Sequence, residues 1–513
     1  MVNVDSRLWN KPASENYDRP MTLHVRELLS EVGSGKMSAL AYDTAWVARL
    51  GEIDSELSDR ALAWLREHQL PDGSWGAAYP YYHDRLISTL AAIIALARQD
   101  GNQAHRSQID HGLLALERIT NGVTQQLHSD PNGPTIGFEM IVPTLVAEAE
   151  SIGLIRHQGA RILNELSEHR KRKLKLLSGK KISRYITTAF SAEMAGEDGL
   201  ATLDVENLQE ENGSVGCSPS ATAYFNLRVR KDDRKALHYL RQACGPDGGI
   251  PNVAFIDTFE TAWTLWNLSL IPGHEDLPAE FDIRRHVDFL SRAWDKHNGA
   301  GFSSEYSVND GDETAVVYDT LLRYGVTKNL DGILGYEEDG WFRCFDLESD
   351  PSMSANVHVL GALRQAGFDK DSPPIRKILR FLEERRSDQG YWKDKWHTSA
   401  YYTTSHAVIA CAGFADATVR SAVEWILQTQ NADGSWGRPF PTAEETAYCI
   451  QALEIWQRHS GHISREVIGK AANWLEENSD PPYAPLWIGK GLYSPELVIR
   501  SAVLSALLLS GKG

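Results

Sequence analysis

The segment Gln69–Gly76 reads QLPDGSWG, and it returns as QNADGSWG at Gln430–Gly437, near the other end of the chain. Each copy follows a stretch of helical spacing that contains a tryptophan, Trp64 or Trp425. The central Asp-Gly of each copy is a turn signal. A repeated turn between helices predicts stacked helical hairpins, in which the tryptophan ring packs on the preceding helix and its N–H, or the glutamine amide, satisfies a helix end.

The same organisation extends over the rest of the chain. Weaker echoes of the repeat lie at Asp247–Gly249 and Asp388–Trp392, and apolar residues recur at helical spacing in 86–94 and 497–508. Strand-like alternation is scarce, so the expected fold class is all-α. Because 513 residues exceed one ordinary core, we expect two helical domains.

Composition excludes several classes of function. The net charge of -17 argues against nucleic acid as a partner, because phosphate binding needs excess positive charge. The first twenty residues are polar and no run of eighteen apolar residues occurs, so we expect neither a signal peptide nor a membrane span. The five cysteines lack CxxC spacing and suit reduced, buried thiols in a cytoplasmic protein.

Four further segments narrow the interpretation. They are Ser38–Ala48 (SALAYDTAWVA), Gly137–Glu139 with Pro143, Asp394–Tyr402, and Leu486–Lys490 with Tyr493. Together with the repeats, which resemble QW motifs, they resemble in order the landmarks of the class II diterpene cyclases. The likeness is greatest to the bacterial halimadienyl (tuberculosinyl) diphosphate synthases, and it covers nearly the whole chain.

This resemblance implies a fold and a reaction. The expected architecture is a pair of α/α-barrel domains, the βγ architecture of class II terpene cyclases, with one domain inserted into the other. Residues 1–52 and 260–513 would form the catalytic β domain, and residues 53–259 the inserted γ domain, with the active site between them. Such enzymes protonate the far end of a prenyl diphosphate and close rings while the diphosphate is retained.

The segment Asn309–Ala315 (NDGDETA) resembles the DxDD motif of the family with Glu in the last place. Protonating an alkene needs a protonated carboxylic acid, yet an ordinary Asp with a pKa near ~3.9 is protonated about once in a thousand molecules at pH 7. Crowded, buried carboxylates resist ionisation and titrate as a unit. The alternative is a plain helix N-cap with acidic residues in the first turn.

The resemblance assigns roles to individual residues. Asp312 would be the proton donor, and Asp310 and Glu313 would tune it and return its proton. Asn356, in the segment Ser354–His358, would hydrogen-bond the acid. Aromatic ring faces stabilise cations, and the candidates, each of which is equally an ordinary core residue, are Trp263, Trp396, Tyr401 and Tyr402.

The substrate diphosphate requires a cation and magnesium. Lys395 matches a lysine of the family. Lys173 and Lys175 belong to a basic run that would supply a further cation; the alternative is that this run is only a solvated helix face. The acidic magnesium motif of the family is poorly matched at residues 128–132, which leaves Asp130 and Glu139 as candidate Mg²⁺ ligands. The product would pass to a downstream class I synthase or phosphatase.

The termination region departs from the pattern of the family. Plant enzymes that make unrearranged copalyl diphosphate hold a water between a His and an Asn. Here Asn252 keeps the Asn, whereas Ser191 stands where the His is expected. Serine is a poor base near neutral pH, and an unquenched cation rearranges in a dry cavity. The expected product is therefore a rearranged halimadane- or clerodane-type diphosphate; plain copalyl diphosphate made with another base is the alternative.

Competing functions remain at this point. A class I terpene synthase would need a metal-binding DDxxD cluster, and the nearest string, Asp232–Ala236, continues with basic residues that do not suit magnesium. An α/α-barrel glycosidase also pairs carboxylates in an aromatic cleft. A prenyl-binding module without catalysis, or a drimane-type cyclase acting on farnesyl diphosphate, would share the aromatic cavity.

Overall fold

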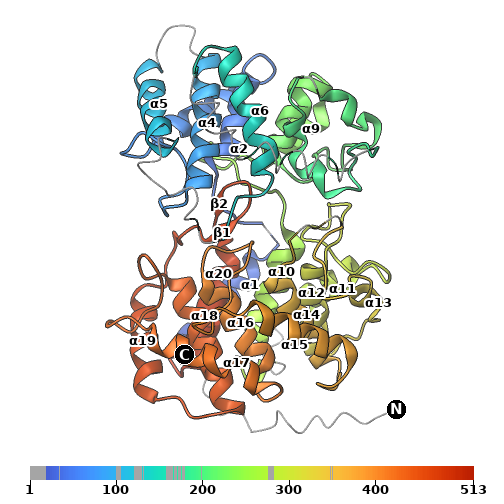
Figure 1. Cartoon of the computed structure of the whole chain (residues 1–513), viewed down its shortest axis with the longest axis vertical. Coiled ribbons are helices and arrows are strands. Elements are labelled where there is room, and N and C mark those ends of the chain that lie inside the picture. The colour runs from blue at the N-terminus through green and yellow to red at the C-terminus, as the bar shows by residue number, and fades with distance from the viewer. Residues whose placement is uncertain are drawn as a thin grey trace.

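The computed structural model describes residues 19–33, 35–99, 105–120, 130, 132–156, 166, 170, 175, 179–197, 199–274, 282–346, 348 and 350–512. These residues form two helical domains, each around its own hydrophobic core (Figure 1). One core draws on residues 25–29 and 262–509, and the other on residues 41–254. The all-α prediction with two α/α-barrel domains is confirmed.

The catalytic domain is a barrel of helices in two layers. Within the described residues, six inner helices contact one another in a closed ring. They are α10 (Asp257–Ser269), α12 (Gly311–Arg323), α14 (Met353–Gln365), α16 (Ala400–Cys411), α18 (Ala443–His459) and α20 (Glu496–Leu509). The outer layer contains α1 (Arg19–Glu31), α11 (Ile283–Ala293), α13 (Asp331–Leu334), α15 (Pro373–Arg385), α17 (Asp416–Gln428) and α19 (Arg465–Glu477).

The inserted domain is a smaller ring of the same kind. Its ring contains α2 (Ala41–Val47), α4 (Tyr82–Gln99), α6 (Phe138–Ser151), the 3₁₀ segment η3 (Thr187–Ala195) and α8 (Pro219–Tyr224). Around it lie η2 (Ala48–Leu50), α3 (Ser55–Glu67), α5 (Arg106–Thr120), η4 (Leu200–Thr202), η5 (Val205–Asn207), η6 (Phe225–Val229) and α9 (Arg234–Ala243). Since α2 packs in this core, the inserted domain begins before residue 41 and not at residue 53 as expected.

The QW repeats connect helices as expected from the sequence. The Trp75 indole N–H donates to the carbonyl of Leu65 at 2.7 Å, and that of Trp436 donates to the carbonyl of Ile426 at 2.8 Å. Each acceptor belongs to the last turns of the preceding helix, α3 or α17. The Gln69 and Gln430 amides bond backbone carbonyls of their own turn and of an outer helix one further along the chain, α5 or α19. The repeats therefore have a structural role.

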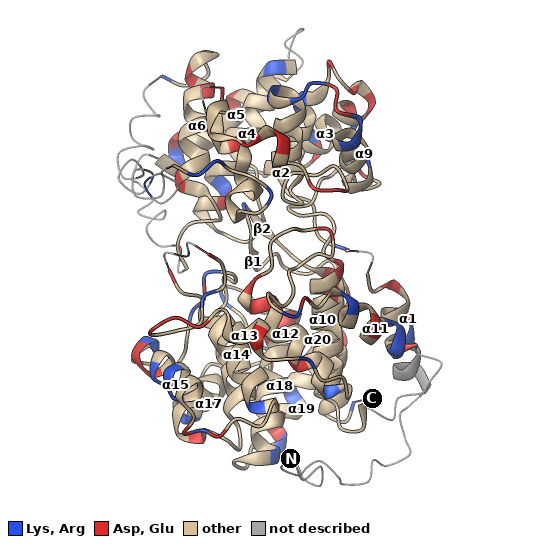
Figure 2. Cartoon of the chain, turned by 90° about the vertical axis from the view of Figure 1, so that its right-hand side faces the viewer, with Lys and Arg blue, Asp and Glu red and all other residues tan. Residues whose placement is uncertain are grey.

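A short hairpin joins the two domains. Strands β1 (Trp487–Ile488) and β2 (Leu492–Tyr493) pair antiparallel at the domain junction (Figure 1). Leu486, Ile488 and Leu492 of this hairpin pack with Tyr79 and Tyr81 of the inserted domain. Lys and Arg are scattered among Asp and Glu over both domains (Figure 2). Within the described residues, no helix combines the length and apolarity needed to cross a bilayer.

Candidate active site

Three carboxyl groups gather where the inner helix α12 begins. Asp310 is the N-cap, and its Oδ1 accepts the Glu313 N–H at 2.7 Å. A Cβ at Gly311 would lie 2.3 Å from the carbonyl oxygen of Arg343, so glycine allows the helix start to pack against that loop. Asp310 therefore caps the helix and also belongs to the carboxyl cluster. The two interpretations of the motif, helix cap and acid cluster, are compatible.

Burial keeps two of these groups protonated near neutral pH. It raises the pKa of Asp310 to about 8, with a further contribution from the charge of Asp312. Burial, followed by the charges of Asp310 and Asp312, raises the pKa of Glu313 well above its usual range. The ionised form is disfavoured by lost hydration and by like charges nearby. Asp310 and Glu313 are therefore neutral neighbours of Asp312.

Asp312 differs from its neighbours in exposure and partners. Its side chain is 16% exposed, whereas Asp310 and Glu313 are each 4% exposed. His358 Nδ1 lies 2.5 Å from Asp312 Oδ1, and the Ser354 hydroxyl lies 3.3 Å from Oδ2. Asp312 is thus the most accessible acid of the three.

Helix α14 positions both partners of Asp312. Ser354 and His358 are four residues apart, so they lie on the same helix face. Asp394 caps this helix, since its Oδ1 accepts the backbone N–H of Met353 at 2.7 Å and that of Ser354 at 3.2 Å. Its Oδ2 accepts the Ser354 hydroxyl at 2.9 Å. Asp394 therefore fixes the hydroxyl that faces the acid.

An aromatic cluster lies beside the acid. It consists of Phe259, Trp263, His397, Tyr402 and Trp487. The Trp263 ring lies 4.9 Å from that of His358, centroid to centroid, and the Tyr402 ring stacks on His397 at 4.6 Å. Ring faces of this kind stabilise cations that are shielded from water.

Comparison with known proteins identifies the family. The model of the squalene-hopene cyclase C-terminal domain matches residues 345–452, and that of the prenyltransferase alpha-alpha toroid domain matches residues 18–135. A type B diterpene cyclase from Mycobacterium tuberculosis is 47% identical over 493 residues, which cover 94% of this chain and 98% of that protein. The chain belongs to the class II diterpene cyclases.

Two further comparisons agree. An ent-copalyl diphosphate synthase from a Streptomyces species is 31% identical to this cyclase over 471 residues, 86% of this chain and 87% of that protein. The structure of the ent-copalyl diphosphate synthase from Streptomyces platensis matches with a TM-score of 0.79 at 28% identity, over 96% of this chain and all of the other.

The structure brings together five of the residues named from the sequence but corrects a sixth. Asp310, Asp312, Glu313, Trp263 and Tyr402 lie at the same end of the barrel. Asn356 does not contact Asp312. Its amide bonds the backbone N–H and carbonyl of Phe342 at 2.8 and 2.9 Å. Position 356 lies about 200° around the helix from position 354, so Asn356 and Ser354 point to different sides. His358 is the residue of this helix that contacts Asp312 together with Ser354.

Three other candidates lie apart from the acid or are already paired. Tyr401 points to the outer layer, where its ring packs on Trp425 at 4.7 Å, as the core alternative predicted. Trp396 is half-buried and adjoins Phe345. The Lys395 ammonium pairs with Glu348 and donates to the Asp350 carbonyl at 2.5 Å. Lys395 thus offers no unpaired charge to a diphosphate in this arrangement.

The candidate magnesium ligands Asp130 and Glu139 lie at the starts of two helices of the inserted domain. Asp130 accepts the backbone N–H groups of Tyr82 and His83 at 3.1 and 3.0 Å and pairs with the His83 ring at 2.7 Å. Both its oxygens therefore serve the start of α4. Glu139 is buried in the first turn of α6. Within the described residues, no group of three His, Cys, Asp or Glu side chains has the arrangement of a metal site.

The remaining candidates belong to the inserted domain. Lys173 lies outside the described residues, and Lys175 is exposed. Asn252 is buried, and its Oδ1 accepts the Lys490 backbone N–H at 3.0 Å. Ser191 is also buried, and its neighbour Phe190 contacts the Lys490 ammonium across 4.6 Å. Both residues of the expected termination region thus adjoin the β1–β2 hairpin.

Sequence reasoning missed several residues of the site. His358, His397 and Trp487 all fall inside segments that carried the resemblance, but the sequence assigned them no role. For His358 a signal existed, because its four-residue spacing from Ser354 places both on one helix face. For Trp487 there was none, since only the closed barrel brings the hairpin beside α10 and α16.

Proposed function

We propose that this cyclase acts on geranylgeranyl diphosphate and converts it to a bicyclic diterpenyl diphosphate of the halimadane, clerodane or labdane type, with the diphosphate retained. The observation that carries the proposal is Asp312, the most accessible of three clustered acids, held between His358 and Ser354 beside the aromatic cluster. The names of the relatives, a diterpene cyclase and copalyl diphosphate synthases, support a C20 substrate.

In this mechanism Asp312 transfers its proton to the terminal alkene of the substrate. The carboxylate left behind faces the His358 ring as a donor. The Ser354 hydroxyl, which donates to Asp394 at 2.9 Å, lies 3.3 Å away and can turn its hydrogen to Asp312. Hydrogen bonds to a charged group are stronger than those to a neutral one. The cation forms beside the ring faces of Trp263, Tyr402 and Trp487. Because these side chains also exclude water, the cation survives long enough to close the rings.

Magnesium is proposed as a companion of the substrate. Since the described residues contain no group of three or more His, Cys, Asp or Glu side chains that could hold the ion, we propose that Mg²⁺ arrives bound to the diphosphate, and no step above depends on it. Lys395 is the proposed cation for the diphosphate, provided that substrate displaces Glu348. Replacing Lys395 by Met should then raise KM more than it lowers kcat.

The product skeleton follows from the termination region. Ser191 offers no imidazole where an unrearranged product would require a base, so we propose hydride and methyl shifts and a rearranged halimadane or clerodane skeleton. NMR of the dephosphorylated alcohol tests this proposal. An unshifted C10 methyl together with an exocyclic alkene on the decalin would contradict it.

The substrate is tested with each prenyl diphosphate in turn. The cyclase is incubated with geranylgeranyl or farnesyl diphosphate and Mg²⁺, treated with phosphatase, and the alcohols are analysed by mass spectrometry. A cyclic C20 alcohol is expected. Acyclic geranylgeraniol alone, under conditions where a known cyclase works, would overturn the proposal, and a cyclic C15 alcohol alone would favour the drimane-type alternative.

A further inference from the structure

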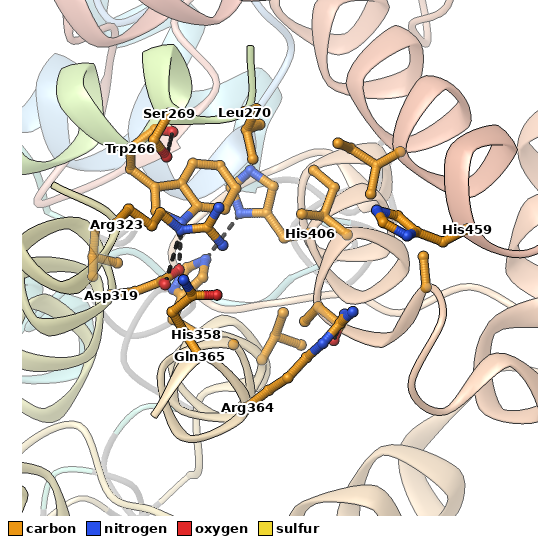
Figure 3. Close-up of a pocket in the computed structure, with 17 residues that line it drawn as sticks. Trp266, Ser269, Leu270, Asp319, Arg323, His358, Arg364, Gln365, His406 and His459 are labelled. Carbon is orange, nitrogen blue, oxygen red and sulfur yellow. Dashed lines mark hydrogen bonds and ion pairs between the residues drawn. The ribbon is translucent and has the colours of Figure 1, made fainter. Parts of the chain in front are cut away.

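The catalytic barrel has a second opening at the end opposite the acid. Asp312 and the aromatic cluster lie at the N-terminal ends of the inner helices, next to the inserted domain. A pocket lies at their C-terminal ends, lined by the last residues of four of them, Ser269, Arg323, Gln365 and His459 (Figure 3). Its volume of about 60 Å³ is several times the ~10–15 Å³ that one water needs.

Two histidines connect this pocket to the acid. His358 and His406 both line it. His358 Nδ1 lies 2.5 Å from Asp312 Oδ1, and His358 Nε2 lies 2.9 Å from His406 Nδ1 (Figure 3). His406 Nε2 has no hydrogen-bond partner among the described atoms. The chain thus runs from the acid to a buried nitrogen of His406, a residue that lines the pocket, and exposed His459 lies at the rim of the same pocket.

The state of His406 suits proton transfer. Burial, followed by the charges of His358 and His397, lowers the pKa of His406 well below its usual range. A neutral imidazole carries one N–H and one lone pair, so it can accept a proton on one nitrogen and donate one from the other. His406 in this state can pass a proton along the chain without holding a stable buried charge.

The charged groups that line the pocket are the carboxylate of Asp319 and the guanidinium groups of Arg323 and Arg364. The C-terminal ends of helices carry partial negative charge, and four inner helices end here. Asp319 adds a carboxylate, bonded to Arg323 at 2.9 Å and to the Trp266 indole N–H at 2.8 Å. The other end of the barrel must stay dry, because water there would quench the cation. The pocket must therefore admit water, whereas the end of the barrel that holds Asp312 must exclude it.

We propose that Asp312 regains its proton after each turnover from water in this pocket, through His406 and then His358, and not from Asp310 and Glu313, to which the resemblance assigned this role. A hydronium ion protonates His406 Nε2 and leaves water. The His406 Nδ1–H bond breaks as a His358 Nε2–H bond forms, and the His358 Nδ1–H bond breaks as the Asp312 carboxylate becomes a carboxylic acid. One proton enters and one reaches Asp312, and ring rotation restores both tautomers.

This proposal rests on the proton-donor role of Asp312, and the kinetics separate the two. An enzyme whose acid is already protonated performs its first turnover without the chain and needs it for the second. His406 is therefore a residue that acts through Asp312, by passing protons to it, and not a group that touches the substrate. A single turnover reports on Asp312, whereas steady-state turnover reports on the supply of protons.

The test is His406→Phe, which keeps an aromatic ring beside Trp263 and Tyr402 but removes both nitrogens. With enzyme in excess, the single-turnover rate should stay within about twofold of wild type, while steady-state kcat should fall about a hundredfold with KM unchanged. The matched control, exposed His462→Phe outside the pocket lining, should leave both rates unchanged. An equal loss in both rates for His406→Phe, or no loss in either, would overturn the proposal.

A second variant addresses the pocket itself and does not alter the histidines. A Cβ at Gly361 would meet only Asp319 Oδ2, at 3.8 Å, so a larger side chain can be added here. Gly361→Leu should fill the pocket and reduce steady-state kcat but not the single-turnover rate, whereas Gly361→Ala should behave as wild type. Undiminished steady-state turnover by folded Gly361→Leu enzyme would exclude this pocket as the proton source.

Discussion

Lys490 Nζ lies 2.6 Å from Glu193 Oε1, and neither side chain has any exposed surface. Lys490 belongs to the β1–β2 hairpin, and Glu193 to segment η3 of the inserted domain. The ammonium also donates to the hydroxyls of Ser218 and Ser220, each at 2.7 Å. Because the same hairpin carries Trp487, this ion pair connects the inserted domain to one wall of the proposed active site.

Removing one partner of the ion pair should be costly. Lys490→Met leaves the Glu193 carboxylate buried without its cation, and breaking a buried pair in this way destabilises a protein by about 3–5 kcal/mol. Urea denaturation measures the loss. The double variant Lys490→Met with Glu193→Gln removes both charges and should recover part of the stability. A single variant as stable as wild type would contradict the anchoring role.

Amide substitutions should separate the donor from its neighbours. Asp312→Asn should lower kcat about a thousandfold or more, because an amide cannot replace a general acid. Glu313→Gln should lose about tenfold or less, since burial already keeps Glu313 protonated and an amide resembles that neutral form. Product formation under saturating substrate, with circular dichroism as the check on folding, measures both. Similar losses in the two variants would remove the distinction between donor and neighbour.

The repeats explain why the fold was predictable. Gln, Gly and Trp at fixed spacing report a local arrangement, a turn whose side chains bond its own backbone and the end of the preceding helix, so the sequence alone indicates it. The position of the first domain boundary was harder to predict from the sequence. Residues 41–47 precede the expected insertion point but pack against α4 and α8, and that contact depends on chain closure far from this segment.

The site was predictable only where its residues share one segment. Asp310, Asp312 and Glu313 lie within one helical turn, so their proximity follows from the sequence. The partner of Asp312 depends on which residues of α14 face the acid, and the choice of Asn356 was wrong because its side chain bonds the backbone of Phe342 instead. His406 could not be found from the sequence, since it reaches the acid only through His358 across the barrel.

The register on α14 predicts opposite phenotypes for two neighbouring positions. Asn356→Ala leaves the buried N–H of Phe342 without its acceptor, which should lower the free energy of unfolding by about 1–3 kcal/mol and affect kcat only slightly. His358→Phe should do the reverse and lower steady-state kcat about a hundredfold with a smaller change in stability. Chemical denaturation and kinetics of both proteins measure the contrast, which would fail if Asn356→Ala were the catalytically impaired variant.

The pH dependence of stability should report the raised pKa of Asp310. In the folded protein that pKa is about 8, against 3.8 for an ordinary Asp. Between these values the folded state binds more protons than the unfolded state, so stability falls as pH rises, by up to about 1.4 kcal/mol per pH unit for this group. Above pH 8 the contribution no longer changes.

Asp310→Asn removes this titration and keeps a side chain that caps helices well. Other buried acids titrate in the same range, including Asp43, Glu260 and Glu445, each with a pKa raised by burial to about 7. The informative quantity is therefore the difference in unfolding free energy between variant and wild type. Because wild type alone keeps the slope from Asp310, this difference should shift in favour of the variant between pH 5 and pH 7. The same measurement on Asp388→Asn, at an exposed turn, should show no shift, and a pH-independent difference for Asp310→Asn would mean that Asp310 is ionised in the folded cyclase.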